Sequence, residues 1–477
     1  MRRMQPWRAS RLGAFSWIIV SGVVATSVGA HAALVVGANV NISRAAGYQA
    51  EEAIAINPTN PLNLFAFSNT SSNNLFGATS FDGGATWTGR LVATGVDIRG
   101  ACCDPTGQFD RFGNLFISYI DSGLTAVNIA TSVNGGVSFA NLFSFAERDQ
   151  PTLVTGPSSN AGINSTWVTY QDTAGTIAAR NLAVTGLNAF GALSAEQLAP
   201  GSGGGNFGDI AVGPGGKTVA IYQKPTGGIG PSTIFSHLDS DGLGAGGFGA
   251  ARSATTTNVG GFAPIPAQPN RTIDSEVSIG YDTSGGAHNG RLYMAYTDRS
   301  SVASTNTDIL FRYSDDDGVT WSAPILVNDD AGVKSQFFPK ISVDPVTGHV
   351  AIVWYDARNS PGNNTVQVFG SISIDGGLSF LANVLIAPGF SDASLQSNPN
   401  EFGDFLGISS YNDVFHPVWA DNSNSTGDNP DGTTNFDIYT ATVTFFGGVS
   451  VPEPSSLLLV ATAAFFLTRA KRRAVHA

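Results

Sequence analysis

The chain has 477 residues, of which 42% are hydrophobic and 13% charged, and glycine contributes 57 of them. A hydrophobic fraction of this size excludes a chain that is disordered throughout. The formal net charge is −12, and eight of the 24 basic residues lie near the two ends, in residues 1–32 and 455–477. The remaining stretch is strongly acidic and repels phosphate backbones, which argues against a nucleic-acid partner.

Residues 1–32 have the three parts of a secretory signal peptide. Arg2 and Arg3 begin a basic segment, an apolar run follows over residues 12–28, and residues 30–32 form a small-x-small cleavage site. We expect export through the inner membrane by the general secretory route, because the residues that flank the arginine pair of a twin-arginine signal are missing. A retained membrane anchor is the alternative.

Residues 33–446 repeat one pattern, in which an apolar stretch is followed by an aromatic residue, any residue, and then Asp or a polar substitute. Turn residues precede most copies, and a second strand follows each. The pattern predicts an all-β fold, a single β-propeller with seven blades, and a six-bladed ring with one decorated blade is the alternative. Strands expected at residues 437–441 and 35–40 would share a blade and close the ring. The aromatic residues are Phe67, Tyr119, Tyr170, Tyr222, Tyr296, Trp354 and Trp419.

Four copies continue into a stereotyped turn of eight residues. Residues 80–87 and 314–321 read Ser-x-Asp-x-Gly-x-Thr-Trp, and residues 132–139 and 373–380 are degenerate copies. We expect the Asp and the hydroxyls to accept backbone N–H groups, the Gly to permit a positive φ, and the aromatic to pack between sheets. The residues assigned this structural role are Ser80, Asp82, Gly84, Trp87, Ser314, Asp316, Gly318, Trp321, Asp375 and Gly377.

Cys102 and Cys103 are the two cysteines of the chain, and they are adjacent. No disulfide framework can therefore span the fold. In an oxidising compartment the pair is a candidate vicinal disulfide, while two free thiols or a disulfide to a partner are the alternatives. Two sulfurs without a histidine at ligand spacing do not make a zinc site.

Six polar residues are candidate ligand-binding groups: Asp298, Arg299, Asp356, Arg358, Glu401 and Asp404. The Asp–Arg neighbours occupy equivalent places in two copies, and arginine is suited to bidentate carboxylate binding. Pairing of each arginine with acids of a neighbouring blade is the structural alternative. The last two residues offer paired carboxylates, which glycoside hydrolysis requires, although acids of exposed loops are the commoner outcome.

Residues 421–437 are rich in the oxygen ligands that calcium prefers, including Asn424, Asp428 and Asp431. A Ca²⁺ site is a candidate there, but an EF-hand is excluded because its helices and closing Glu are missing. No other cofactor is expected.

The C-terminal residues 447–477 combine three features. Pro452, Glu453 and Pro454 precede an apolar run over residues 457–467, and a cluster of Arg and Lys closes the chain. The run predicts a short transmembrane helix with a cytoplasmic basic end. The tail resembles the PEP-CTERM sorting signal of Gram-negative bacteria. That resemblance implies transient anchoring in the membrane, processing by an exosortase, and release to the cell surface or extracellular matrix; a plain tail anchor is the alternative.

The eight-residue turns resemble the Asp box, or BNR repeat, of sialidase-like proteins. The resemblance implies a propeller whose Asp boxes lie on the rim, away from the sugar site. The early Phe/Tyr-Arg-Ile-Pro signature of sialidases is missing, because Ala45 and Ala46 follow Arg44. No motif matches the Tyr–Glu nucleophile pair, so no catalytic residues are carried over. We predict an exported protein that binds envelope or extracellular polysaccharide. A glycoside hydrolase of exo-sialidase type and a non-binding structural matrix protein are the alternatives.

Overall fold

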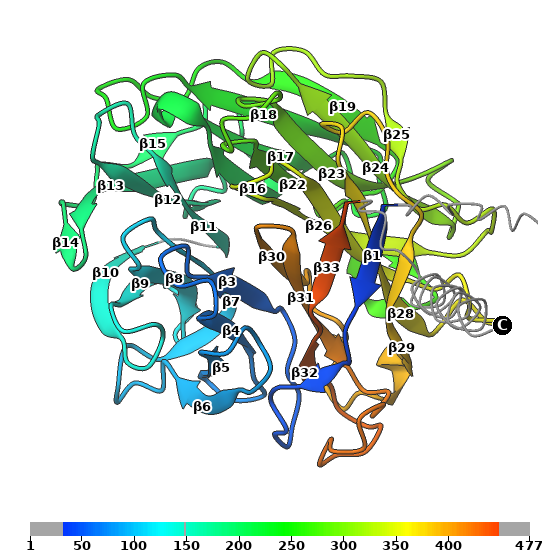
Figure 1. Ribbon diagram of the computed structural model, residues 1–477. Coiled ribbons are helices and arrows are strands. Elements are labelled where there is room, and N and C mark those ends of the chain that lie inside the picture. The colour runs from blue at the N-terminus through cyan, green and yellow to red at the C-terminus, as the bar shows by residue number, and fades with distance from the viewer. Residues whose placement is uncertain (1–31, 147–148, 448–477) are drawn as a thin grey trace, which may run out of the picture. The chain divides into compact units, whose positions relative to one another are not determined.

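The computed structural model describes residues 32–146 and 149–447, and seven antiparallel sheets follow one another around a common axis (Figure 1). The prediction of an all-β, seven-bladed β-propeller is confirmed, and the six-bladed alternative is wrong. The expected signal peptide, sorting motif and flanking helices lie outside the described residues. Within those residues, no helix is long and apolar enough to cross a membrane.

Blade 1 consists of β3 (Ala53–Ile56), β4 (Leu64–Asn69), β5 (Leu75–Ser80) and β6 (Thr88–Val92), and blade 2 of β7 (Ala101–Phe109), β8 (Leu115–Asp121), β9 (Ala126–Ser132) and β10 (Ala140–Ala146). Blade 3 consists of β11 (Asp149–Pro157), β12 (Asn164–Gln171), β13 (Ile177–Gly186), β14 (Ala189–Phe190) and β15 (Gln197–Leu198), and blade 4 of β16 (Asn206–Val212), β17 (Thr218–Pro225), β18 (Ser232–Asp239) and β19 (Arg252–Thr257). A hairpin of β20 (Ala263–Ile265) and β21 (Gln268–Ile273) then separates blade 4 from blade 5.

Blade 5 consists of β22 (Ser278–Tyr281), β23 (Leu292–Arg299), β24 (Thr307–Ser314) and β25 (Ile325–Leu326), and blade 6 of β26 (Gln336–Val343), β27 (Val350–Asp356), β28 (Val366–Ser373) and β29 (Val384–Ser391). Blade 7 combines β30 (Gly407–Tyr411), β31 (Val414–Asp421), β32 (Asp437–Thr440) and β33 (Val443–Phe446) with β1 (Ala33–Val36) and β2 (Val40–Asn41). Two 3-10 turns complete the described part of the chain, η1 (Pro214–Gly216) and η2 (Ala393–Leu395).

The seven aromatic residues of the repeat occupy matching places in the seven blades. Each lies towards the end of the second strand of its blade, and none is more than 1% exposed. Strand residues of successive blades pack into shared clusters: Phe67 of blade 1, for example, shares a cluster with Tyr119 of blade 2. The hydrophobic core therefore lies between the sheets, as the stacking of repeats requires.

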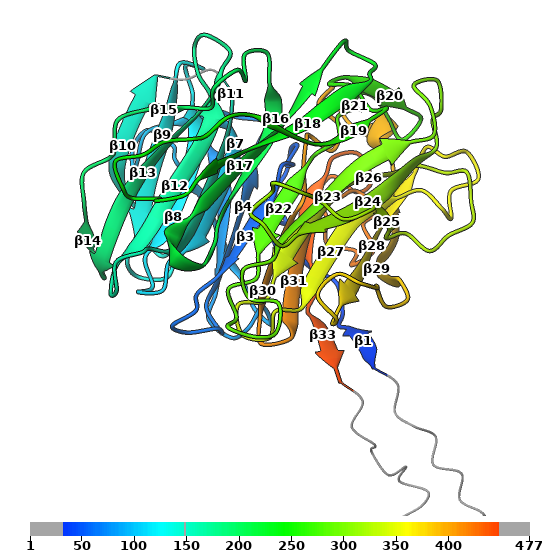
Figure 2. The same cartoon turned by 90° about the horizontal axis from the view of Figure 1, so that it is seen from above.

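Blade 7 closes the ring with strands from both ends of the propeller. β2 pairs with β32 and β1 pairs with β33, and the strands β1 and β33 lie side by side (Figure 2). The innermost strands contact one another in order around the axis, and β30 of blade 7 contacts β3 of blade 1. The expectation that residues 437–441 and 35–40 share the blade that closes the ring is confirmed.

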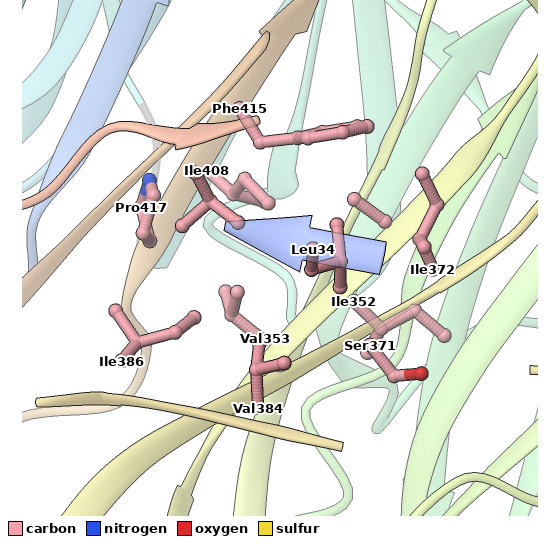
Figure 3. A pocket seen from close by; sticks show the side chains of 13 residues that line it. Leu34, Ile352, Val353, Ser371, Ile372, Val384, Ile386, Ile408, Phe415 and Pro417 are labelled. Atoms are coloured by element: carbon pink, nitrogen blue, oxygen red, sulfur yellow. The ribbon is translucent and has the colours of Figure 1, made fainter. Parts of the chain in front are cut away.

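The seam between blades 6 and 7 is apolar. Leu34 of β1 lies over a cavity of about 10 Å³ whose walls include Ile352, Ile386 and Phe415 (Figure 3). The hydroxyl of Ser371 is the polar side-chain group among the lining residues. This cavity is a small packing gap beneath the closing strand and offers no group for chemistry.

The antiparallel order of the strands gives the ring two distinct faces. We call the face at which the innermost strands begin the upper face, and the opposite one the lower face. Since the strand direction alternates within each blade, the turns between the third and fourth strands lie on the lower face. The polar groups at the starts of the innermost strands therefore belong to the upper face.

Candidate functional site

The innermost strands begin with residues in an uncommon backbone conformation. Five residues that are not glycine have φ between 37° and 58°, in the left-handed region: Glu51, Asp104, Gln150, Glu276 and Phe338. In β7, β11 and β26 the register with the second strand shifts at this place. Such a bulge changes the direction of a side chain, and left-handed residues other than glycine gather where the surrounding structure fixes them.

Six carboxyl groups meet on the upper face, close to the axis. We call them the axial acidic cluster: Glu51, Asp104, Asp149, Asp274, Glu276 and Asp404. They come from the starts of blades 1, 2, 3, 5 and 7. Asp149 is half-buried, and the other five are between 2% and 8% exposed. Charged residues are rarely buried this deeply unless they are paired.

Hydrogen bonds connect these groups across the ring. Asp104 N donates to Glu51 Oε2 at 3.4 Å, and Gln150 N donates to Asp104 Oδ2 at 3.3 Å. Gln150 Nε2 also donates to Asp404 Oδ2 at 3.5 Å, and Arg271 forms an ion pair with the same carboxylate. Residues more than 250 positions apart in the chain therefore share one network.

Two cations face this cluster. The charge of Arg271 acts on Asp404, Glu51, Asp274 and Asp104. The positive charge of Lys340 acts to lower the pKa of Glu276, and the Nζ of Lys340 lies 3.8 Å from Asp209.

The pKa values of the buried carboxyls are raised. Burial is the main cause that raises the pKa of Glu51 to about 7, and the negative charge of Asp404 adds to it, while Arg271 acts in the opposite direction. Burial, followed by the charges of Glu51 and Asp149, holds the pKa of Asp104 well above its usual range. The pKa values of Asp404 and of both acids before β22 are raised as well, again mainly by burial. Part of the cluster therefore carries protons at neutral pH.

The β20–β21 hairpin covers this end of the axis. Its Gln268 side chain donates to Gly403 O at 3.0 Å and accepts from Phe402 N at 3.1 Å. The Glu401 carboxylate accepts from Asn270 N and from Arg271 N, both at 3.1 Å. A segment from between blades 4 and 5 is thus attached to the loop that leads into blade 7, and its Arg271 forms an ion pair with Asp404.

A cavity of about 20 Å³ lies among the starts of the innermost strands, and it has room for about one water molecule. Its lining comes from the innermost strands and the segments that lead into them: Asp104, Thr106, Gln150, Pro151, Thr152, Gly208, Glu276, Lys340 and Phe405. The axis of the ring is therefore charged and polar at this end.

Asp298 and Arg299 lie at the end of β23, outside the cluster. Asp298 Oδ1 accepts from Asn258 N at 2.8 Å and from the Thr257 hydroxyl at 2.9 Å. The Arg299 guanidinium donates to three backbone carbonyls, those of Asn258, Ser304 and Ile229. These contacts tie together the loops around blade 5.

Asp356 and Arg358 lie at the end of β27 in blade 6. Arg358 Nε donates to Asp356 Oδ2 at 2.9 Å, and its Nη1 forms an ion pair with Asp329 at 2.7 Å. Its guanidinium also lies 4.2 Å from the centre of the Phe369 ring. Of the six candidate residues, Asp404 belongs to the axial acidic cluster and Glu401 holds the hairpin above it.

The four eight-residue turns lie on the lower face and share one hydrogen-bond pattern. In the turn at 314–321, the Ser314 hydroxyl donates to Asp316 Oδ1 and accepts from Gly318 N, both at 2.8 Å, and Asp316 Oδ1 accepts from Thr320 N at 2.8 Å. The fifth residue of every turn has φ between 79° and 93°. In each of the other three turns, the serine hydroxyl likewise donates to the side-chain oxygen of the third residue and accepts from the backbone N–H of the fifth. The residues are Ser80, Asp82 and Gly84; Ser132, Asn134 and Gly136; and Ser373, Asp375 and Gly377.

Cys102 and Cys103 form a vicinal disulfide at the start of β7. Both residues are half-buried, and the next residue is Asp104 of the axial acidic cluster. The disulfide therefore fixes the backbone that leads directly into the cluster.

The acids of residues 421–437 bond to protein donors. Asp428 pairs with Arg44 at 2.7 Å, and Asp431 Oδ2 accepts from Gly47 N at 2.7 Å. Across residues 32–146 and 149–447, no three His, Cys, Asp or Glu side chains are grouped so as to hold a metal ion.

The sequence analysis missed most of the axial acidic cluster, because the residue at the start of the innermost strand differs in type from blade to blade. One signal was present. Asp104, Gln150 and Phe338 each precede a proline at the start of a blade. An alignment of the repeats on this X–Pro dipeptide would have placed Asp104 and Gln150 at equivalent positions.

Comparison with protein-family models and with curated proteins finds no match. Among solved structures, a protein of unknown function from Dyadobacter fermentans matches with a TM-score of 0.47 and 11% identity, covering 87% of this chain and 99% of its own. The endosialidase of phage phi92 matches with a TM-score of 0.47 and 10% identity, covering 87% of this chain and 70% of its own. An α-L-arabinanase from Penicillium chrysogenum matches with a TM-score of 0.44 and 16% identity, covering 71% and 98%. At these scores the likeness carries no inference about the chemistry of this chain.

Proposed function

We propose that this chain is an exported carbohydrate-binding protein whose ligand site is the axial acidic cluster. One observation carries the proposal: six carboxyl groups, Gln150 and Arg271 converge at the upper end of the axis from segments far apart in the chain. Burying charged groups costs free energy. A purely structural hub would be filled more favourably by apolar side chains, so this concentration of charge favours a binding role over a non-binding matrix protein.

The chemistry of these groups suits a polyhydroxylated ligand. Carboxylates accept hydrogen bonds from sugar hydroxyls, while Gln150 and Arg271 can donate to them. The side chain of Arg271 is 27% exposed, and Asp149 and Gln150 are half-buried. The cluster therefore reaches the surface beside these three residues. We place the ligand there.

The cellular setting forms part of the same proposal. Export by the signal peptide of residues 1–32 and processing of the tail at Pro452, Glu453 and Pro454 by an exosortase would deliver the propeller to the cell surface or extracellular matrix. There it would meet envelope or extracellular polysaccharide. The shared hydrogen bonds of the four turns support their identity as Asp boxes, with Asp82, Asp316 and Asp375 in structural roles.

The test is a glycan array probed with the purified full-length chain, alongside Arg271→Ala and Asp404→Asn. We expect the chain to bind at least one class of polysaccharide and both variants to lose most of that binding. The control is Asp315→Asn, which removes a charge on the lower face from a side chain that is 63% exposed. Binding that survives both variants would place the ligand elsewhere, and a silent array would favour the matrix protein.

Glycoside hydrolysis is the second candidate function, and Glu51 is the observation that favours it. Its pKa of about 7 leaves a proton available near neutral pH, as a general acid needs. The exo-sialidase form of this candidate requires three arginines around one sugar carboxylate. Arg299 and Arg358 bond instead to groups around blades 5 and 6. Turnover of a fluorogenic glycoside that is lost in Glu51→Gln would establish the enzyme.

A further inference from the structure

The axial acidic cluster has more acids than the cations beside it can neutralise. Six carboxyls face Arg271 and Lys340. Five of the six are no more than 8% exposed, so water screens them poorly. Carboxylates in such surroundings favour the approach of a further positive charge. In the free protein, protons on part of the cluster offset this surplus, and a cationic ligand would take their place.

A second observation is an unused hydrogen-bonding group near the cluster. The Tyr48 hydroxyl is buried and has no hydrogen-bond partner. The charges of Glu51, Glu52, Asp404 and Arg271 act on this hydroxyl, so it lies near the cluster. Buried polar groups in folded proteins are nearly always bonded. A phenol left free beside three carboxyls marks an open position for a polar group of a ligand.

The cavity among the starts of the innermost strands matches a small polar group in size. Its volume of about 20 Å³ suits a group about as large as a water molecule, such as an ammonium. Asp104, Gln150 and Glu276 contribute oxygen acceptors to its wall. Lys340 is the cation among the lining residues, and its charge is directed at Glu276 and at Asp209, which lies 3.8 Å from its Nζ. An ammonium donates three hydrogen bonds and accepts none, which fits a wall rich in acceptors.

We infer that the preferred ligand is a sugar bearing a protonated primary amine, such as a hexosamine unit that has lost its acetyl group. The ammonium lies in the cavity between Asp104 and Glu276, and the sugar hydroxyls face Asp149, Gln150 and Arg271. A neutral hydroxyl in the same place would replace none of the protons that the cluster holds at neutral pH. This inference rests on the proposed carbohydrate binding and narrows it to one class of sugar.

The test compares two ligands that differ only at nitrogen, the hexamer of glucosamine and the hexamer of N-acetylglucosamine. Isothermal titration of the full-length chain should show the amine hexamer binding at least about tenfold more tightly, because a hydrogen bond to a charged group contributes more than a neutral one. Asp104→Asn and Asp404→Asn should each remove most of this preference. Asp315→Asn should keep it, which separates the cluster from general attraction of a polycation to an acidic protein.

Tyr48→Phe covers the case in which a cluster variant fails to fold. It removes a hydroxyl that has no partner, so the fold should persist, and amine binding should weaken about fivefold. Equal affinity for the two hexamers would overturn the inference and leave carbohydrate binding in place. A preference that survives Asp104→Asn and Asp404→Asn would also overturn it. Binding to neither hexamer, together with a silent glycan array, would remove the proposed function as well.

Discussion

Arg271 and Asp404 form an ion pair across the upper end of the ring, joining the hairpin before blade 5 to the loop before blade 7. Asp404 is almost completely buried, and its side chain also accepts from Gln150 of blade 3. Three separate parts of the propeller therefore depend on one carboxylate. The pair organises the candidate site and fastens the segment that covers it.

Removing Arg271 should cost stability as well as binding. Arg271→Ala leaves Asp404 buried without its partner, so the free energy of unfolding should fall by about 3 kcal/mol. The double variant Arg271→Ala/Asp404→Asn should recover part of this loss, because it no longer buries an unpaired charge. Denaturant unfolding measures both. The control is Arg44→Ala, whose pair with Asp428 is exposed and should contribute less than about 1 kcal/mol.

The axial acidic cluster should make the protein more stable in mild acid. Glu51 has an ordinary pKa near 4.5 in the unfolded chain and about 7 in the fold. Between these values the folded state binds more protons, so stability falls as the pH rises through this window. The melting temperature should be higher at pH 5 than at pH 7.5. Glu51→Gln should reduce this difference in melting temperature. If the difference is unchanged in that variant, groups other than Glu51 cause it.

The serine of an eight-residue turn should contribute measurably to stability. Ser314 is buried, and its hydroxyl both accepts from Gly318 N and donates to Asp316. Ser314→Ala leaves that buried N–H without its acceptor and should lower the free energy of unfolding by about 1–2 kcal/mol. Ser300→Ala, at an exposed position after β23, is the matched control. Similar losses in both variants would contradict a special role for the turn.

The vicinal disulfide should matter more for binding than for stability. The loop that Cys102 and Cys103 close is the shortest a chain allows, so losing it should lower the free energy of unfolding by only about 1 kcal/mol. Asp104 follows directly, and its position in the cluster depends on this backbone. Reduction with a dithiol, or the variant Cys102→Ser/Cys103→Ser, should weaken ligand binding several-fold. Unchanged affinity in the reduced protein would show that Asp104 is held by its other contacts.

The architecture could be predicted because each blade buries its faces against its neighbours in the same way. A buried aromatic residue on the second strand has to recur wherever one sheet stacks on the next, so Tyr119 and Trp354 carry the same signal despite their different side chains. The eight-residue turns recur for a similar reason, since their hydrogen bonds are local in sequence. Periodicity of this kind is visible in a single chain.

The site could not be predicted in the same way. Its residues differ in type, from Glu51 and Asp104 to Gln150 and Phe338, and what they share is a backbone conformation at the start of an innermost strand. Their proximity arises when the ring brings segments hundreds of residues apart to one axis. The sequence analysis found Asp404 from its neighbour Glu401, but Arg271 had no motif to mark it.

Ala33 and Phe446 face each other as partners in the pair β1–β33. The last blade therefore cannot be completed until the final strands of the propeller have left the ribosome and met the first. Contacts this distant in sequence form slowly, so closure of the ring should be a late step of folding. The same adjacency makes the ring a suitable scaffold for circular permutation, in which a short linker joins these two residues and new ends are opened in an exposed loop.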